Sequence, residues 1–222
     1  MNEAGYGQYC PIARALEVLG ARWTLLVVRE LLLGATRLDE LTGALPGASR
    51  RLLTRRLAQL REAGVVQPEG DGFRLTEAGY RLEPIVFGLG DWGARYRFGP
   101  PRVDELDPLA LLWSVHRQLD TAALPGPRTI IAVELTDDDR RFWIAVGARR
   151  RLPAPPPSAA PVDVTVTASL PALFEVWMGR TPLADALEAG TIGFGGPAEL
   201  ADALRTALRP SPVAAVVRAA GR

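Results

Sequence analysis

Residues 49–76, SRRLLTRRLAQLREAGVVQPEGDGFRLT, join a basic amphipathic helix to a short pair of strands. On a helical wheel of about 100° per residue, Leu53, Leu57 and Leu60 share one side, and Leu52 lies at its margin. The opposite side carries Arg50, Arg51, Thr54, Arg55, Ala58 and Arg61. The pattern predicts a helix that packs through leucine and presents arginine to its surroundings.

The ends of this helix are marked in the sequence. Ser49 is a natural N-cap, because its hydroxyl can accept a hydrogen bond from the first turn, and Gly64 stops the helix after about Ala63. Arg56 is an exception on the wheel, since it falls near the core-facing side. We therefore expect its guanidinium to find a partner or to extend to the surface.

The flanking segments predict further elements. Residues 65–67 and 73–75 read as a β-hairpin with a turn of about five residues, and Thr76 caps a long final helix. Apolar spacing predicts helices over 12–19 and 23–33, the second of them apolar nearly all round and so buried. A capping-box pattern at Thr36–Asp39 starts a third, short helix through Leu41.

Three short helices, an arginine-faced helix, a small hairpin and a capping helix describe a winged helix-turn-helix. Such a helix fits the major groove of DNA, which is about 12 Å wide. An arginine-rich face can also be simply a solvated face, but the hairpin that follows favours contact with DNA. We expect DNA contacts from Arg50, Arg51, Thr54 and Arg55, with Ser49 and Arg74 at phosphates.

Four segments carry a resemblance to a known family: GQYCPIARALEVLGARWTLLVVREL at 7–31, RLDEL at 37–41, LTRRLAQLREAG at 53–64 and LTEAG at 75–79. Together they resemble HxlR-type winged-helix regulators over about residues 6–95. The resemblance implies a homodimeric transcription factor, with a dimer built from the N-terminal and last helices. Its two recognition helices would read half-sites about one DNA turn apart.

Cys10 has two interpretations. In some regulators of this kind a cysteine at this place senses electrophiles or oxidants, and such chemistry needs a thiol with a lowered pKa near a helix N-terminus or an arginine. Cys10 precedes a helix, and Arg14 follows one turn later. The alternative is an inert, partly buried side chain.

The segment Phe98–Arg102, FGPPR, interrupts regular structure and divides the chain. We place a DNA-binding and dimerisation domain at 1–98 and a second domain at 103–222. The second domain should begin with a helix over 106–119. Predicted strands then cover 129–135, 141–147 and 162–167, and helices start after Ser169, at Pro182 and at Pro197, with a short strand from Ile192. Residues 153–161 read as an inserted surface loop, and Asp137–Asp139 as a polar hairpin tip.

Residues 163–197, DVTVTASLPALFEVWMGRTPLADALEAGTIGFGGP, resemble the C-terminal half of sterol-carrier-protein-like domains. Gly195 replaces the acidic residue usual before the last turn. The resemblance implies a cavity for an apolar ligand between a sheet and its helices. The candidate lining residues are Trp113, His116, Trp143, Phe174, Trp177, Met178 and Phe194. These rings can equally be plain core, and His116 can be a structural residue on the apolar face of its helix.

Composition excludes several classes of function. The 222 residues carry a net charge of +1, with one cysteine and one histidine. A disulfide framework and a His/Cys metal cluster are therefore excluded, and so is most Ser-His-Asp and Cys-His machinery. We expect no enzyme, no catalytic or metal-binding residues and no cofactor. The sequence shows no signal peptide and no apolar run of about 18 residues, so we expect a cytoplasmic protein with no membrane partner.

The sequence as a whole predicts an α+β protein, in which a winged helix-turn-helix domain precedes an α/β sterol-carrier-like domain. Its function would be that of a dimeric regulator or repressor that binds a double-stranded DNA operator and an apolar small-molecule effector. Two alternatives remain open. One is a small-molecule carrier or sequestering protein that uses the winged helix only to dimerise. The other is a redox-sensing regulator based on Cys10.

Overall fold

The computed structural model describes residues 5–126, 128–147 and 161–221. The chain forms two compact units, divided between Leu89 and Gly90. This division falls inside helix α6, Glu83–Tyr96, rather than at the 98–102 segment where the sequence places the boundary. No helix in the described ranges is long and apolar enough to cross a membrane.

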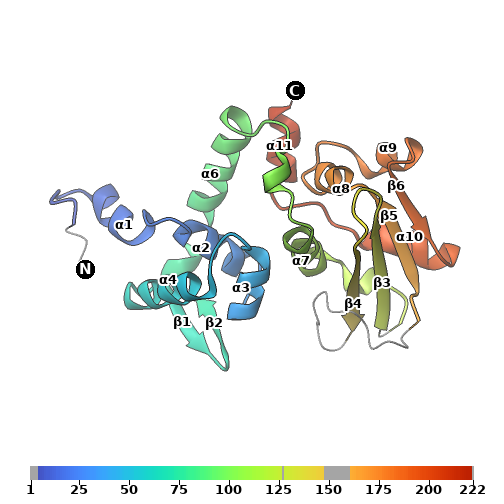
Figure 1. The fold of residues 1–222 in the computed structure, drawn as a ribbon. Coiled ribbons are helices and arrows are strands. Elements are labelled where there is room, and N and C mark those ends of the chain that lie inside the picture. The colour runs from blue at the N-terminus through green and yellow to red at the C-terminus, as the bar shows by residue number, and fades with distance from the viewer. Residues whose placement is uncertain (1–4, 127, 148–160, 222) are drawn as a thin grey trace. The chain divides into compact units, whose positions relative to one another are not determined.

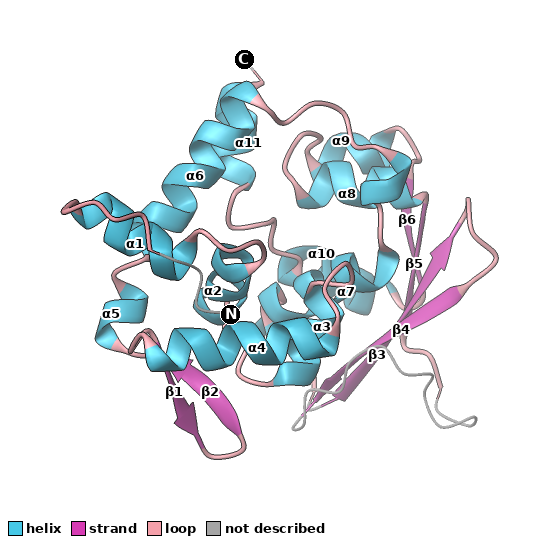
Figure 2. Cartoon of the chain, turned by 60° about the vertical axis from the view of Figure 1, so that its left-hand side comes forward, coloured by secondary structure: helices cyan, strands magenta, loops and turns pink. Residues whose placement is uncertain are grey.

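The first unit has the element order of a winged helix-turn-helix (Figure 1). Its elements are α1 (Pro11–Leu19), α2 (Thr24–Leu32), α3 (Leu38–Ala44), α4 (Arg50–Glu62), β1 (Val66–Glu69), β2 (Gly72–Leu75), α5 (Glu77–Tyr80) and the first part of α6. The β1–β2 hairpin lies beside α4 in both ribbon views (Figures 1 and 2). The predicted order of a basic helix followed by a wing is confirmed.

Helix α4 forms as its sequence predicts. The Ser49 hydroxyl accepts a hydrogen bond from the backbone nitrogen of Leu52 at 3.2 Å, and Gly64 follows the helix in the left-handed conformation with φ +71°. Leu53, Leu57 and Leu60 are buried in the core of the unit, which they form with α2 and the hairpin. The leucine side of the wheel is therefore the packed side.

Helix α3 is capped one residue later than predicted. Arg37 is its N-cap, and the carboxylate of Glu40 accepts hydrogen bonds from the backbone nitrogens of Thr36 at 2.7 Å and Arg37 at 3.1 Å. Glu40 thus satisfies amide groups that the start of a helix leaves without partners. The expected pairing of Thr36 with Asp39 is wrong, and Asp39 is left exposed for another contact.

Helix α2 is buried on one side only. Val27 and Val28 are fully enclosed, whereas Leu26 is exposed, so the prediction of a buried helix holds for one side of α2 and not for the other. Its buried face includes a charge: the carboxylate of Glu30 accepts hydrogen bonds from Nε of Arg29 at 2.8 Å and from Nη2 at 2.6 Å. A buried carboxylate is tolerated here because it is hydrogen-bonded.

The end of the first unit differs from the sequence prediction in two places. Glu69 pairs with Gly72, so the hairpin turn is Gly70-Asp71 and the strands are longer than expected. Gly70 takes φ +57°, the conformation that two-residue hairpin turns require. The helix capped by Thr76 ends at Tyr80, and α6 starts anew at Glu83. Pro84 cannot continue the α5 hydrogen-bond pattern, because it has no amide proton.

The second unit is a four-stranded sheet in the order β4-β3-β5-β6, with β3 and β5 parallel and the other pairs antiparallel. Its strands are β3 (Arg128–Leu135), β4 (Arg141–Gly147), β5 (Val164–Ala168) and β6 (Ile192–Gly195). Its helices are the rest of α6, α7 (Pro108–Gln118), α8 (Leu170–Trp177), α9 (Leu183–Glu188), α10 (Ala198–Ala207) and α11 (Ala214–Ala220), with 3-10 turns at Val103–Glu105 and Thr121–Ala123. Figure 2 shows α7, α8 and α9 on one side of the sheet.

Most elements of the second unit follow their local signals. Ser169 caps α8 by accepting from the backbone nitrogen of Ala172 at 3.3 Å, and Gly190 ends α9 with φ +67°. Helix α11 is an addition that the sequence reading did not contain, since its seven Ala- and Val-rich residues have no N-capping side chain. Residues 153–160 of the predicted loop lie outside the described residues. The α+β class is confirmed, and the sterol-carrier-like assignment stays a prediction.

Candidate functional site

The exposed face of α4 is the strongest basic feature of the first unit. Ser49, Arg50, Arg51, Thr54 and Arg55 are all exposed, while the leucines of the same helix are buried. Thr54 donates its hydroxyl hydrogen to the backbone oxygen of Arg50 at 3.0 Å. Arg74 is exposed on β2 of the adjacent hairpin. The wheel therefore separates the packed and presented residues as predicted.

Arg56 is tied to its own unit. Its Nε donates to the backbone oxygen of Arg22 at 3.0 Å, and its Nη1 donates to the side-chain oxygen of Gln59 at 2.6 Å. The expectation of a partner for this arginine is confirmed. Its guanidinium links α4 to the segment before α2 and is not part of the presented face.

Carboxylates neutralise three of the arginines around this face. Arg50 pairs with Asp39 at 2.6 Å, and Arg74 pairs with Glu69 at 3.0 Å. Two further residues make the third pair, Arg37 before α3 and Asp71 in the hairpin turn. These acids are not among the site residues predicted from the sequence, because they lie outside the basic run. Within the described residues, Arg51 and Arg55 have no ion pair, so they present their full charge.

The pairing changes the titration of the acids involved. The hydrogen bond and charge of Arg50 hold the pKa of the Asp39 carboxyl below its ordinary value. Arg37 does the same to the pKa of Asp71. Because both pKa values are depressed, both pairs are present at neutral pH and are lost only as the pH falls through those lowered values. At neutral pH Asp39 therefore competes with any phosphate for Arg50.

Replacing Asp39 by asparagine should strengthen DNA binding by roughly three- to tenfold, because it returns the full charge of Arg50 to the α4 face. Anisotropy titrations at several salt concentrations measure both the affinity and its salt dependence. The pair is exposed, so its loss should change stability little. Asp202→Asn, which removes the partner of Arg205 on α10, is the matched control. Weaker binding by Asp39→Asn would contradict the competition.

Two helices present apolar residues. On α6 Ile85, Leu89, Trp92 and Tyr96 are exposed, and their spacing places them along one stripe. On and before α1 the exposed apolar residues are Tyr6, Tyr9, Ile12 and Leu16. Neighbouring exposed apolar residues of this size mark interaction surfaces. We call these sets the α6 stripe and the α1 face.

Cys10 lies at the N-cap position of α1 and is half-buried. Its side chain makes no capping hydrogen bond. Arg14, one turn further along, pairs instead with Glu17 at 3.2 Å. The arginine that the sequence places near the thiol is therefore engaged by a carboxylate.

The second unit contains an apolar cavity of about 190 Å³ that is partly open to the surface. The cavity is lined by Leu111, Leu112, Val115, Leu119, Ile131, Val133, Ile144, Val166, Leu173, Val176, Trp177, Thr181, Pro182, Leu183, Ile192, Phe194, Leu204, Leu208, Arg209, Pro210 and Arg218. Most of its wall is aliphatic and comes from the sheet and from α7, α8 and α10. These aliphatic residues are not among the candidates predicted from the sequence, which are mostly large rings.

Of the seven candidate ligand residues, Trp177 and Phe194 line this cavity. Phe174 and Met178 line a second hollow of about 410 Å³ beside Arg97–Arg102. The other three, Trp113, His116 and Trp143, border neither space. His116 lies on α7 and is buried, with 3% of its surface exposed to solvent. On β4, Phe142 is buried and Trp143 is half-buried, because neighbouring strand residues point to opposite faces.

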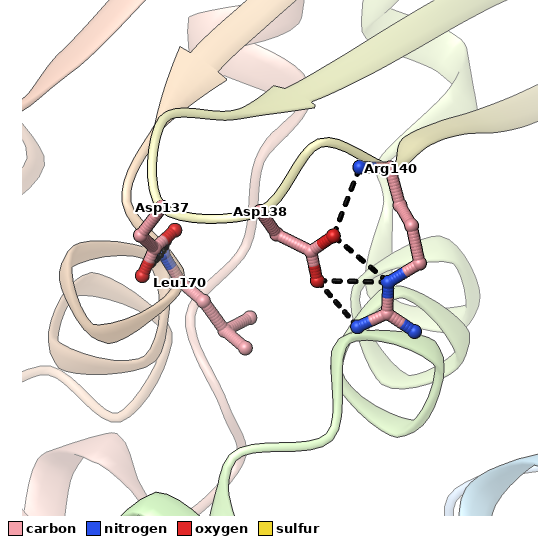
Figure 3. Close-up of polar contacts among 4 residues, drawn as sticks. All are labelled: Asp137, Asp138, Arg140 and Leu170. Atoms are coloured by element: carbon pink, nitrogen blue, oxygen red, sulfur yellow. Dashed lines mark hydrogen bonds and ion pairs between the residues drawn. The ribbon is translucent and has the colours of Figure 1, made fainter.

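The acidic tip between β3 and β4 has structural contacts (Figure 3). Asp137 accepts a hydrogen bond from the backbone nitrogen of Leu170 at 2.9 Å, at the start of α8, and Asp138 pairs with Arg140. Arg140 holds the pKa of the Asp138 carboxyl below its ordinary value. These contacts fit the interpretation as a polar hairpin tip. In the described parts of the chain no group of three His, Cys, Asp or Glu side chains is arranged to hold a metal ion.

Comparison with known proteins places the first unit among regulators. Residues 18–99 match the family model of HxlR-like helix-turn-helix proteins. The HTH-type transcriptional regulator YdeP of Bacillus subtilis is 30% identical over 105 residues, which are 44% of this chain and 80% of YdeP. YvaP of the same organism is 34% identical over 104 residues, or 43% of this chain and 94% of YvaP.

Solved structures similar to this chain include the redox regulator HypR in its oxidized form. HypR is 31% identical, with a TM-score of 0.38, and the match covers 40% of this chain and 100% of HypR. Another is the quinone-bound YodB from B. subtilis, which is 30% identical with a TM-score of 0.37. That match covers 39% of this chain and 100% of YodB.

Proposed function

This chain belongs to the HxlR-like helix-turn-helix family of transcriptional regulators, and we propose that it is a homodimeric repressor whose second unit binds an apolar effector. DNA is its partner as a member of this family. The observation that carries the proposal furthest is the exposed, arginine-rich face of α4 beside the hairpin. Dimerisation, the contact residues and the effector are the parts that experiment must test.

In this proposal α4 lies in the major groove and contacts DNA through Arg50, Arg51, Thr54 and Arg55. Ser49 and Arg74 contact phosphates on either side. The exposure of all six side chains supports this assignment. Since Arg51 and Arg55 have no ion pair within the described residues, they should contribute most of the electrostatic attraction.

The proposed dimer uses the α1 face and the α6 stripe. Their large exposed side chains are costly to leave in water, and burying them against a second copy would remove that cost. A dimer of this kind presents two copies of α4 to two half-sites, about one DNA turn apart.

The proposed effector occupies the apolar cavity of the second unit. Binding there changes DNA affinity only if the effector has different affinities for two arrangements of the recognition helices. The aliphatic wall of the cavity supports an apolar ligand.

A gel-shift assay with the DNA upstream of this protein's own gene tests the function as a regulator. We expect retardation of that DNA at protein concentrations at least about 1,000-fold lower than for unrelated DNA of equal length. Equal affinity for both DNAs would contradict specific regulation. It would favour the alternative of a carrier protein that uses its winged helix only to dimerise.

The second alternative is a regulator that responds to oxidation of Cys10, which is half-buried at the start of α1. Diamide should then release DNA from the wild-type protein and leave Cys10→Ser bound. Release that is the same in both proteins excludes a role for the thiol.

A further inference from the structure

The described charged side chains that line the apolar cavity of the second unit are all positive. Of the described residues that line it, the charged ones are Arg209 and Arg218, and no carboxylate is among them. The remaining wall is apolar apart from the hydroxyl of Thr181 and the indole nitrogen of Trp177. A site of this composition favours a molecule with an apolar body and a negatively charged end.

The two arginines differ in their partners. Nη2 of Arg209 lies 2.6 Å from the carboxylate of Asp120, and this contact holds the pKa of the Asp120 carboxyl below its ordinary value. The charge of Arg209 is therefore already matched. Arg218 forms no ion pair with any residue that the structure describes, and its helix α11 contributes it to the lining. The unmatched positive charge at the cavity is that of Arg218.

Close packing holds α11 at this place. Gly179 follows α8 with φ +76°, and a Cβ there would lie 2.7 Å from Cβ of Ala214 and 3.0 Å from Nη1 of Arg218. A glycine is thus needed for α11 to approach so closely. Just before α11, the backbone nitrogen of Ser211 donates to the backbone oxygen of Trp177 at 2.8 Å. Arg218 is positioned by this packing and not by a carboxylate.

We propose that the cavity binds an aliphatic carboxylate, with its chain among the aliphatic side chains and its carboxylate at Arg218. The inference rests on the proposed function in taking the cavity as the effector site. A guanidinium can donate two parallel hydrogen bonds to a carboxylate, which a neutral alcohol cannot accept in the same way and an ammonium opposes by its charge. The volume of about 190 Å³ lies below the roughly 300–1,000 Å³ of drug-sized pockets. It therefore favours a chain of medium length.

Calorimetric titration of the full chain with sodium octanoate, 1-octanol and octylamine tests this inference. The three probes share an eight-carbon chain and differ in the charge of the end group. We expect octanoate to bind at least about tenfold more tightly than octanol, and octylamine to bind least. Equal affinity for octanoate and octanol overturns the carboxylate inference and leaves an apolar effector site standing. If none of the three probes binds, both the carboxylate inference and the apolar effector site are overturned.

Two variants test whether Arg218 is the residue that binds the carboxylate of octanoate. Arg218→Gln should lower octanoate affinity about tenfold, to the level of octanol, and should leave octanol affinity unchanged. Arg128→Gln, which removes an exposed arginine that does not line the cavity, is the matched control. An unchanged octanoate affinity in Arg218→Gln overturns the role of Arg218. A parallel loss of octanol binding also overturns it, because it would show a change in packing.

Discussion

Replacing Arg51 and Arg55 together by alanine should weaken binding to the upstream DNA by at least about 100-fold near 0.1 M salt. The slope of log affinity against log salt should become shallower by up to about 1.8 per protomer, because each arginine charge that helps to neutralise the DNA phosphates contributes up to about 0.9. Both measurements come from anisotropy titrations across a range of salt concentrations.

The size of the effect follows from where these two side chains lie. Both are exposed on the face of α4 opposite its buried leucines. Neither forms an ion pair with a described residue, in contrast to Arg50 and Arg74, whose charges are matched by Asp39 and Glu69. Their removal should leave the fold intact, since surface substitutions of this kind change stability little.

A charge-matched control separates this effect from a change in net charge. Arg141→Ala combined with Arg205→Ala removes two exposed arginines from the second unit, each from a surface ion pair. We expect this control to bind DNA nearly as the wild type does. The recognition-helix assignment is wrong if the Arg51/Arg55 variant keeps both the affinity and the salt slope.

Combining Ile12→Glu with Leu89→Glu should convert the protein from a dimer to a monomer. The two changes place a carboxylate on the α1 face and another on the α6 stripe, where a dimer would have to bury them. Burying an unpaired charge is costly enough to disrupt an interface. Light scattering should report half the wild-type mass, while circular dichroism should show unchanged helix content.

Loss of the dimer should also lower operator affinity by at least about 100-fold, since the two half-sites are then bound independently. Val103→Glu with Leu109→Glu is the matched control, because both residues are exposed and apolar but belong to neither surface. A wild-type monomer would contradict the proposed dimer. A variant that remains dimeric would instead place the interface elsewhere on the chain.

Local sequence predicted the first unit well, since its signals act over a few residues. The spacing of Leu53, Leu57 and Leu60 fixes the buried side of α4, and Ser49 supplies its cap from an adjacent position. The same reasoning misjudged α2, because burial on each side of a helix depends on what packs there. It also missed the break between α5 and α6, although Pro84 was a usable signal.

The cavity was harder to predict. Large rings were the natural candidates, yet most of the wall consists of aliphatic side chains brought together by the sheet and its helices. Strand alternation predicts that Phe142 and Trp143 face opposite sides, but it does not say which side carries an open space. Arg218 lies on a helix with no capping signal, so its place at the cavity could not be anticipated.

The sequence by itself determined the order of elements, the two faces of α4 and the regulator family of the first unit, because these depend on periodicity and short motifs. Tertiary structure decided which charges from separate segments of the chain are matched. Asp39 meets Arg50 across 11 positions of chain, and Asp120 meets Arg209 across 89. Such pairs form where the packing of separate elements brings side chains within hydrogen-bond distance, and no local pattern encodes that approach. Of the arginines proposed to bind DNA or the effector, they leave Arg51, Arg55 and Arg218 without an ion pair among the described residues.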